Sequence, residues 1–176
     1  MSWFAIYTRA RHEKKVYDKL IEKDIESFLP LTKQLRQWKD RRKWVEVPLF
    51  NSYIFLNIEL KNKIYALQTD GVVRLVSFGG EPARIPDWEI DQLKRVIENT
   101  DTLKSEQYLK IGDYVEVKNG PLAGIRGYLR EIRGEWRVAI LVNGVHQSAS
   151  FVVDQVNVEK IHEEAKQANL AGSISR

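Results

Sequence analysis

The chain has 176 residues, of which 43% are hydrophobic and 30% charged, a composition typical of a folded protein with one or two small domains. It has no cysteine, which excludes disulfide bonds and thiolate metal sites, and no apolar run reaches the roughly 18 residues that cross a bilayer. The net charge is +4, and residues 1–48 hold 12 basic side chains against 7 acidic ones, whereas the remainder holds 16 against 17. A polyanionic partner is therefore expected to meet the first quarter of the chain.

The first hundred residues predict an open mixed β-sheet with helices packed on it, in the order β-α-β-β-α-β-α. Apolar, β-prone runs predict extended segments at 3–8, 28–31, 45–48, 53–58 and 72–78. Apolar residues at helical spacing predict helices over 11–23 and 60–67. A third helix is expected to begin with Asp87 as N-cap and to bury Ile90, Leu93, Val96 and Ile97.

The pattern changes after residue 99. Residues 100–109 are polar and unpatterned, as in a linker between domains. Five short β-prone runs follow within about 50 residues, and Asn143-Gly144 between two of them is a hairpin signal. Such strands, with no helix to cover them, favour a small closed barrel over residues 110–161, which we expect to keep a β form. Residues 162–176 lack an apolar face and are expected to form a flexible tail.

The sequence shows none of the residue arrangements that catalysis or metal binding requires. The histidines lack metal-ligand spacing such as i, i+4; they are His12, His146 and His162. Ser148 and Ser150 alternate along a predicted strand without a candidate base nearby in the sequence, and Gly79-Gly80 does not open a helix as a phosphate-binding loop would. We therefore predict a binding protein that is not an enzyme and that uses no cofactor and no metal.

Two clusters of basic residues are candidate nucleic-acid sites. The first is the tip of an expected hairpin and holds Lys39, Arg41, Arg42 and Lys43. If all four contacted duplex phosphates, the slope of log K against log salt concentration would be about −3.6. The second precedes and opens the first helix, with Arg9, Arg11, Lys14 and Lys15. A solvated turn and an ordinary charged helix face remain the alternative interpretations of the two clusters.

A set of strand residues is a candidate apolar site. Its members are Tyr7, Tyr53, Phe55, Leu75 and Phe78. Alternation sends some side chains of each strand to either face of the sheet, so a face without helices would leave aromatic rings open to a partner helix. The alternative is that these residues belong to the core.

Several segments, taken in order, resemble those of NusG-type transcription factors. Trp3–Tyr7 followed by Glu13–Val16 resembles the opening of their N-terminal domain, called NGN. Pro48–Leu56 resembles the central strand of that domain, and Gly71–Val76 resembles a later strand. The segment from 112 to 127 resembles the KOW motif that opens an SH3-like barrel, with Gly120, Pro121, Gly124 and Gly127 at its characteristic positions. The resemblance covers residues 2–161.

The resemblance implies an α+β protein with an NGN domain over residues 1–99 and a KOW barrel over residues 110–161. It implies a monomeric bacterial transcription elongation and antitermination factor, cytoplasmic and nucleoid-associated through RNA polymerase. In this family the NGN domain docks on the clamp helices of the largest polymerase subunit, and basic residues face upstream or non-template DNA. Matching motifs place Tyr7, Tyr53, Leu75 and Phe78 in the polymerase cavity, with Phe55 in the same candidate set. They place Arg9, Arg11 and Arg74 toward DNA, with the 39–43 tip close to it and nascent RNA as a further candidate.

Two departures from the family pattern favour a specialised member. Where the general factor has Pro-Gly before the strand tyrosine, this chain has Asn51-Ser52, a loss similar to that in paralogues such as RfaH. The general factor carries a barrel aromatic that contacts Rho or a small-subunit ribosomal protein, and Asn143 at that position puts both partners in doubt. We therefore predict an operon-targeted antiterminator similar to the UpxY group, which acts on polysaccharide-synthesis operons. The alternatives are the general housekeeping factor and a KOW-containing RNA- or ribosome-binding module.

Overall fold

The computed structural model describes residues 1–37, 40–100, 103–107 and 112–161. The chain divides into two compact units, the first holding residues 1–91 with 142–146 and the second holding residues 92–141 with 147–176. The predicted tail over 162–176 and the basic residue Lys39 lie outside the described residues. None of the helices in the described ranges is long and apolar enough to cross a membrane.

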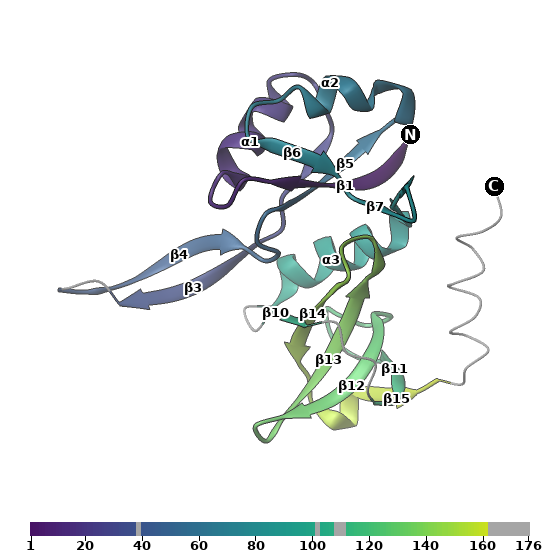
Figure 1. The fold of residues 1–176 in the computed structure, drawn as a ribbon. Helices are drawn as coiled ribbons and strands as arrows, with labels where there is room; N and C mark the ends of the chain where they lie inside the picture. Colours follow the sequence, from purple (N-terminus) through teal and green to yellow (C-terminus); the bar gives the residue numbers. More distant parts are fainter. Residues whose placement is uncertain (38–39, 101–102, 108–111, 162–176) are drawn as a thin grey trace. The chain divides into compact units, whose positions relative to one another are not determined.

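An antiparallel sheet forms the centre of the first unit (Figure 1). Its strand order is β2 (Ser27–Phe28), β5 (Tyr53–Ile58), β1 (Ser2–Thr8) and β6 (Val72–Leu75), with β9 (Arg84–Ile85) also paired to β1. All four pairings are antiparallel, so the α+β class is confirmed while the predicted mixture of parallel and antiparallel strands is not found in this sheet. Strand β5 has the predicted bounds because tyrosine, isoleucine and phenylalanine, which favour strands, dominate its six residues.

The main core of the first unit lies between this sheet and two helices. Helices α1 (Glu13–Ile21) and α2 (Lys63–Leu67), the second preceded by the 3-10 turn η1 (Leu60–Asn62), cover one face of the sheet (Figure 1). The strand register places Phe4 opposite Leu56 and Ile6 opposite Ile54, so these side chains point to the helix-covered face. The buried cluster comprises Phe4, Ile6, Val16, Leu20, Ile25, Leu29, Ile54, Leu56, Ile58 and Ala66.

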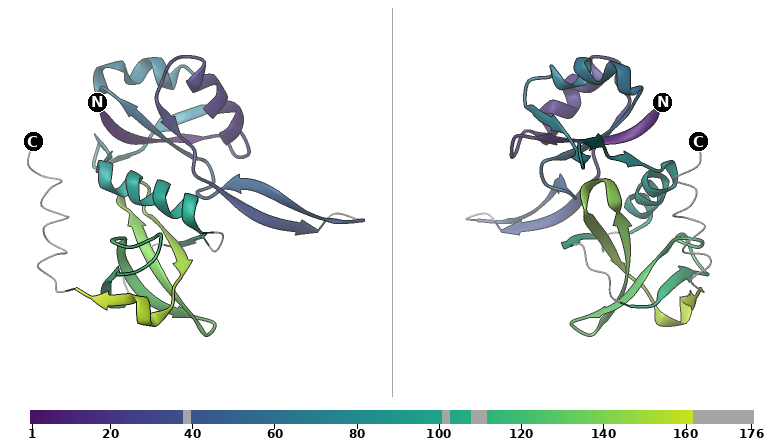
Figure 2. Two further views of the ribbon diagram at one scale, coloured as in Figure 1. Left: turned by 180° about the vertical axis from the view of Figure 1, so that it is seen from behind. Right: turned by 45° about the vertical axis from the view of Figure 1, so that its right-hand side comes forward.

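A separate two-stranded hairpin projects from the first unit. It consists of β3 (Leu31–Gln37) and β4 (Arg42–Pro48), paired over seven residues from Leu31 opposite Pro48 to Gln37 opposite Arg42 (Figure 2). The sequence predicts only a short tip between two apolar strands, whereas the strands continue through the polar stretch. The outer strands lack the apolar alternation that would predict them, because neither face of the outer hairpin is buried. Backbone hydrogen bonds between the two strands hold these residues instead.

The predicted strand over 72–78 is interrupted. Strand β6 ends at Leu75, the backbone N–H of Val76 donates to Ala5 O at 2.8 Å, and the chain then forms the small hairpin of β7 (Ser77–Phe78) and β8 (Glu81–Pro82). Helix α3 (Asp87–Asn99) begins at Asp87 itself, one residue earlier than predicted. Ile90, Leu93 and Val96 are fully buried, as the helical spacing predicts.

The second unit is built on a six-stranded sheet of order β10-β14-β13-β12-β11-β15. The strands are β10 (Lys104–Gln107), β11 (Tyr114–Val117), β12 (Arg126–Ile132), β13 (Glu135–Val142), β14 (Gln147–Val152) and β15 (Val158–Lys160), with 3-10 turns η2 (Asn143–Val145) and η3 (Gln155–Asn157) in the chain. The five strands predicted after residue 110 are all present. The sixth, β10, lies in the segment predicted as a linker and pairs with β14, so this segment contributes to the sheet.

Two glycines of the KOW-like segment have structural reasons to be glycine. Gly124 adopts φ +83° in the turn after β11, where its backbone N–H donates to Val117 O at 2.7 Å. Gly127 lies in β12 beside the antiparallel strand β13, and a Cβ at this position would be 2.5 Å from the backbone oxygen of Ala139. The resemblance to the KOW motif is thus matched by turn and packing requirements of this sheet.

Candidate functional site

A row of three side chains crosses the sheet of the first unit on the face opposite the helices. Tyr7 of β1 pairs with Tyr53 of β5 on one side and with Arg74 of β6 on the other. The two tyrosine rings meet edge to face with centroids 5.3 Å apart, and the Arg74 guanidinium lies 5.5 Å from the Tyr7 centroid. Both tyrosines are half-buried and Arg74 is exposed. The row therefore combines a rigid aromatic surface with a cation held against it.

The other residues of the predicted polymerase set do not extend this row: Phe55 shares its face but is buried, and Leu75 and Phe78 lie elsewhere. Phe55 is fully buried, with its ring 6.1 Å from both Phe28 and Phe50. Leu75 pairs with Ile6 and packs half-buried against the helix-side core, so alternation places it on the face opposite Tyr7. Phe78 is 43% exposed on the small β7–β8 hairpin. The structure thus joins Tyr7 with Tyr53 and separates Leu75 from them.

The turn before Tyr53 is fixed by a buried carboxylate that the sequence pattern does not reveal. Ser52 is buried with φ +67°, and its backbone N–H donates to Glu13 Oε1 at 2.7 Å. Its carbonyl accepts the N–H of Thr8 at 2.8 Å. Because Glu13 lies in the first turn of α1, its side chain ties the helix, the end of β1 and the Asn51-Ser52 turn together. These bonds set where Tyr53 enters the sheet.

The basic cluster at the start of α1 is partly neutralised. The side chains of Arg9, Arg11, Lys14 and Lys15 are exposed. A guanidinium nitrogen of Arg9 lies 3.8 Å from Asp70 Oδ1, and the Lys19 ammonium donates to Asp70 Oδ2 at 2.8 Å. The Lys19 hydrogen bond, with the charges around it, holds the pKa of Asp70 below its usual range. Among described residues, Arg11, Lys14 and Lys15 make no ion pair and stay open to an anion.

The β3–β4 hairpin accounts for the whole net positive charge of the chain. Residues 31–48 hold six basic and two acidic side chains, whereas the other residues hold 22 of each sign. The predicted tip residues Arg41, Arg42 and Lys43 are exposed. The structure adds Lys33 and Arg36 from the paired strands, which are also exposed. The cationic region is therefore an extended arm and is larger than the predicted tip.

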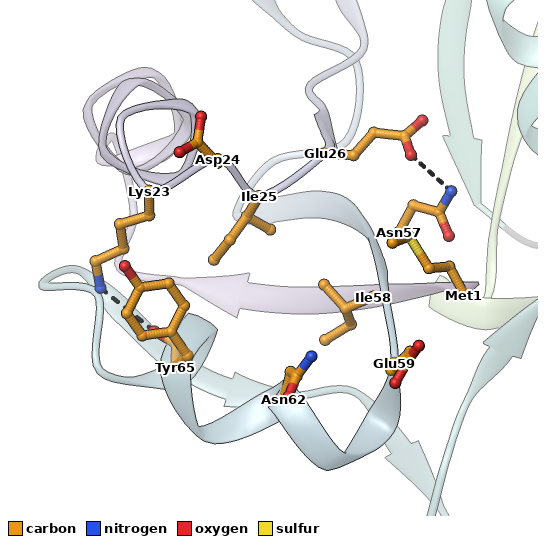
Figure 3. A pocket seen from close by; sticks show the side chains of 10 residues that line it. All are labelled: Met1, Lys23, Asp24, Ile25, Glu26, Asn57, Ile58, Glu59, Asn62 and Tyr65. Carbon is orange, nitrogen blue, oxygen red and sulfur yellow. Dashed lines mark hydrogen bonds between the residues drawn. The ribbon is translucent and has the colours of Figure 1, made fainter.

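A concave pocket of about 440 Å³ lies at the other end of the first unit's sheet (Figure 3). Its lining includes the carboxylates of Asp24, Glu26 and Glu59 and the basic side chain of Lys23. Several of its polar groups already bind one another: Asn57 Nδ2 donates to Glu26 Oε2 at 2.7 Å, and Lys23 Nζ donates to the Tyr65 carbonyl at 3.3 Å. The excess of carboxylates disfavours an anionic ligand, and no predicted site residue lines the pocket.

A comparison with protein families identifies the group to which this fold belongs. The model of the family described as "NusG: Transcription termination factor nusG" matches residues 1–94, just over half of the chain. The chain belongs to the NusG family. The matched region contains the tyrosine row, the basic cluster at α1 and the whole β3–β4 hairpin, whereas the KOW-like segment lies outside it.

Similar proteins extend the NusG likeness over most of the chain. The transcription termination/antitermination protein NusG of Pseudomonas aeruginosa is 26% identical over 176 residues, which cover 90% of this chain and 98% of that protein. The protein of the same name from Staphylococcus carnosus is 25% identical, over 90% of this chain and 95% of its own. The solved structure "Domain interaction in Thermotoga maritima NusG" is 24% identical, covers 92% of this chain and 97% of that one, and has a TM-score of 0.52. These matches support a NusG-type fold beyond residue 94.

Proposed function

We propose that this chain is a transcription elongation and antitermination factor that binds RNA polymerase through its first unit and suppresses pausing and termination. The observation that carries the proposal is the row of Arg74, Tyr7 and Tyr53 in a NusG-family sheet. Half-buried aromatic rings on a rigid sheet lose little side-chain entropy on binding and offer area to a partner helix. The related proteins carry termination/antitermination in their names, which supports the same process here.

The proposed partner of the face that bears Tyr7 and Tyr53 is the pair of clamp helices in the largest polymerase subunit. Tyr7 and Tyr53 provide the contact, and Arg74 and the α1 cluster face upstream or non-template DNA. Phe55 follows Tyr53 by two residues on β5 and is fully buried, so it is proposed to pack beneath the sheet face that bears Tyr53 and not to contact the polymerase. The protein acts without catalysis, as a monomer in the bacterial cytoplasm.

A specialised, operon-targeted role is proposed over the general one. The Asn51-Ser52 turn and Asn143 depart from the residues of the general factor, one in each predicted domain. The proposed targets are polysaccharide-synthesis operons, as for the UpxY group, and neither Rho nor a ribosomal protein is proposed as a partner. The general factor is the second candidate, favoured by alignments that run nearly end to end with proteins named NusG.

Transcription in vitro separates these roles. Purified RNA polymerase would transcribe through a terminator placed behind this protein's own operon leader, and through the same terminator behind an unrelated leader. We expect greater read-through with the protein on its own leader only. Equal read-through on both templates would favour the general factor, and no change on either template would contradict the proposed function.

A further inference from the structure

The β3–β4 hairpin exposes an aromatic side chain that the proposed function does not use. Trp44 is 63% exposed and is the most exposed of the four tryptophans that the structure describes. It lies directly opposite Leu35, which is 47% exposed. Burying the indole in the core would stabilise the fold, so an indole kept in water on a projecting arm indicates a binding role.

Cations flank this exposed pair on the same face of the hairpin. Paired residues of antiparallel strands share a face, and the next residue along each strand points to the other one. The face of the pair therefore also carries Arg42 on the tip side and, on the base side, Lys33 opposite Glu46. Arg42 Nε donates to Gln37 Oε1 at 3.1 Å, which links the side chains of this facing pair across the hairpin. The opposite face carries Arg36.

We propose that this face binds an unpaired nucleotide of single-stranded nucleic acid, with a base stacked on Trp44 and the adjoining phosphates held by Arg42 and Lys33. The net charge of +4 on residues 31–48 selects a polyanion over an ordinary protein surface. An aromatic face that stacks any base, set among cations that follow the backbone, is the usual arrangement for single strands. A base inside a duplex is already stacked and cannot meet the indole.

The proposal deepens the nucleic-acid contact of the proposed function and rests on it. It differs from phosphate contact alone, because it assigns the hairpin a preference for unpaired bases. Single-stranded DNA and single-stranded RNA share this chemistry. The test therefore uses single-stranded DNA and single-stranded RNA.

The test measures binding of the full-length chain to fluorescein-labelled 12-nucleotide single strands of mixed sequence, as DNA and as RNA, and to the DNA duplex. Anisotropy titrations would be run at several salt concentrations. We expect Trp44→Ala to weaken single-strand binding about 5- to 150-fold, from the 1–3 kcal/mol of one stacked base, with duplex binding changed less than about 2-fold. The slope against log salt concentration should stay unchanged, because no charge is removed.

Three further variants separate stacking from other causes. Trp44→Phe should retain most of the single-strand affinity, whereas Trp44→Leu, which keeps an apolar side chain without an aromatic face, should lose it as Trp44→Ala does. Arg42→Gln, on the Trp44 face, should weaken single-strand binding and flatten its salt slope by about 0.7, because the proposal gives Arg42 one phosphate contact. Stacking should also quench indole emission in the unaltered chain, and Trp44→Phe should abolish that component.

The outcomes that overturn the proposal are distinct from failure of the proposed function, since the assay contains no polymerase. Absence of single-strand binding by the unaltered chain at 50 mM salt would overturn it. Equal single-strand affinity of Trp44→Ala and the unaltered chain would also overturn it, and would favour a protein partner for Leu35 and Trp44. Full single-strand affinity of Trp44→Leu would contradict base stacking, because it would show that an apolar side chain without an aromatic face is sufficient. A stronger effect on RNA than on DNA, or the reverse, would identify the strand while supporting the proposal.

Discussion

Ser52 holds a backbone conformation that few side chains adopt, at the point where the chain enters the central strand. Its φ of +67° lies in the left-handed region, and its N–H is held by the carboxylate of Glu13. The resemblance to the general factor suggests glycine here, and the structure gives the reason, because glycine meets this φ without steric cost. Here the two backbone hydrogen bonds of the turn, from Ser52 N–H to Glu13 and from Thr8 N–H to the Ser52 carbonyl, hold the serine in this conformation.

Substitutions at Ser52 test this explanation of the turn. We expect Ser52→Val to lower the free energy of unfolding by about 2 kcal/mol, because a β-branched residue is strained at this φ. Ser52→Gly should stay within about 1 kcal/mol of the unaltered chain, since relief of strain offsets the added freedom of the unfolded chain. Urea unfolding followed by circular dichroism measures both, and a valine variant as stable as the glycine variant would contradict the explanation.

The carboxylate of Glu116 gives the barrel a defined pH dependence. It accepts hydrogen bonds from Arg126 Nε at 2.7 Å and from the Lys118 ammonium at 3.1 Å, and these bonds, the Arg126 bond first, lower its pKa. A lowered pKa in the folded state adds stability above the ordinary value of 4.5, and that stability is lost as pH falls through the folded value.

The expected result is a difference between two variants that depends on pH. At pH 7 the chain with Glu116 should be more stable than Glu116→Gln, and the gap should close as pH falls from about 5 to 3. Thermal unfolding at a series of pH values measures the gap. Glu131→Gln, which removes an exposed carboxylate from the neighbouring strand β12, is the control. A gap that persists at pH 3 would mean that ionisation of Glu116 is not its source.

At the scale of elements, the barrel depends on the close approach of β12 and β13. A methyl group at Gly127 would lie 2.5 Å from the Ala139 carbonyl oxygen and 2.8 Å from Val138 Cγ1. We expect Gly127→Ala to cost about 1–3 kcal/mol, because the backbone atom cannot move aside without breaking the ladder. Glu131→Ala, exposed on the same strand, should change stability by less than about 0.5 kcal/mol. Denaturant unfolding that ranks the two variants equally would contradict the close approach.

The elements differ in how far the sequence could predict them. The buried face of α3 follows from helical periodicity, because burial on one side imposes it. Tyr53–Ile58 follows instead from a continuous run of strand-favouring residues, three of which in succession are buried. The outer half of the β3–β4 hairpin could not be predicted in this way, because its residues 33–37 face solvent on both sides. Strand β10 was missed for a related reason, since Lys104–Gln107 is a polar edge segment held by pairing with β14.

For the candidate site, the sequence predicts single residues but not which of them share a face of the sheet. Tyr7, Tyr53 and Arg74 come together because the register of three strands aligns them, and the family motifs pointed to each residue separately. Leu75 was grouped with them although it faces the opposite side, because the motif does not show the register. Glu13 was missed, because an acidic residue in a first helical turn is commonly exposed and here reaches a buried turn.

At the scale of the whole molecule, the positive charge of the hairpin and the proposed polymerase-binding face occupy different parts of the first unit. Replacing residues 33–46 by an Asn-Gly turn would remove six basic and two acidic side chains and leave the chain with no net charge. We expect this variant to lose salt-dependent nucleic-acid binding and to retain association with RNA polymerase. Anisotropy titration and polymerase co-purification measure the two properties, and loss of polymerase association with the hairpin would contradict this separation.

The central claim is that the face bearing Tyr7 and Tyr53 binds RNA polymerase, and association with the purified enzyme tests it most directly. The unaltered chain should co-purify with RNA polymerase and Tyr53→Ala should not, because the substitution removes the half-buried ring that packs edge to face against Tyr7, with centroids 5.3 Å apart. Tyr65→Ala, which removes a tyrosine 52% exposed on α2, is the matched control and should bind as the unaltered chain does. Retained binding by a folded Tyr53→Ala variant would contradict the claim.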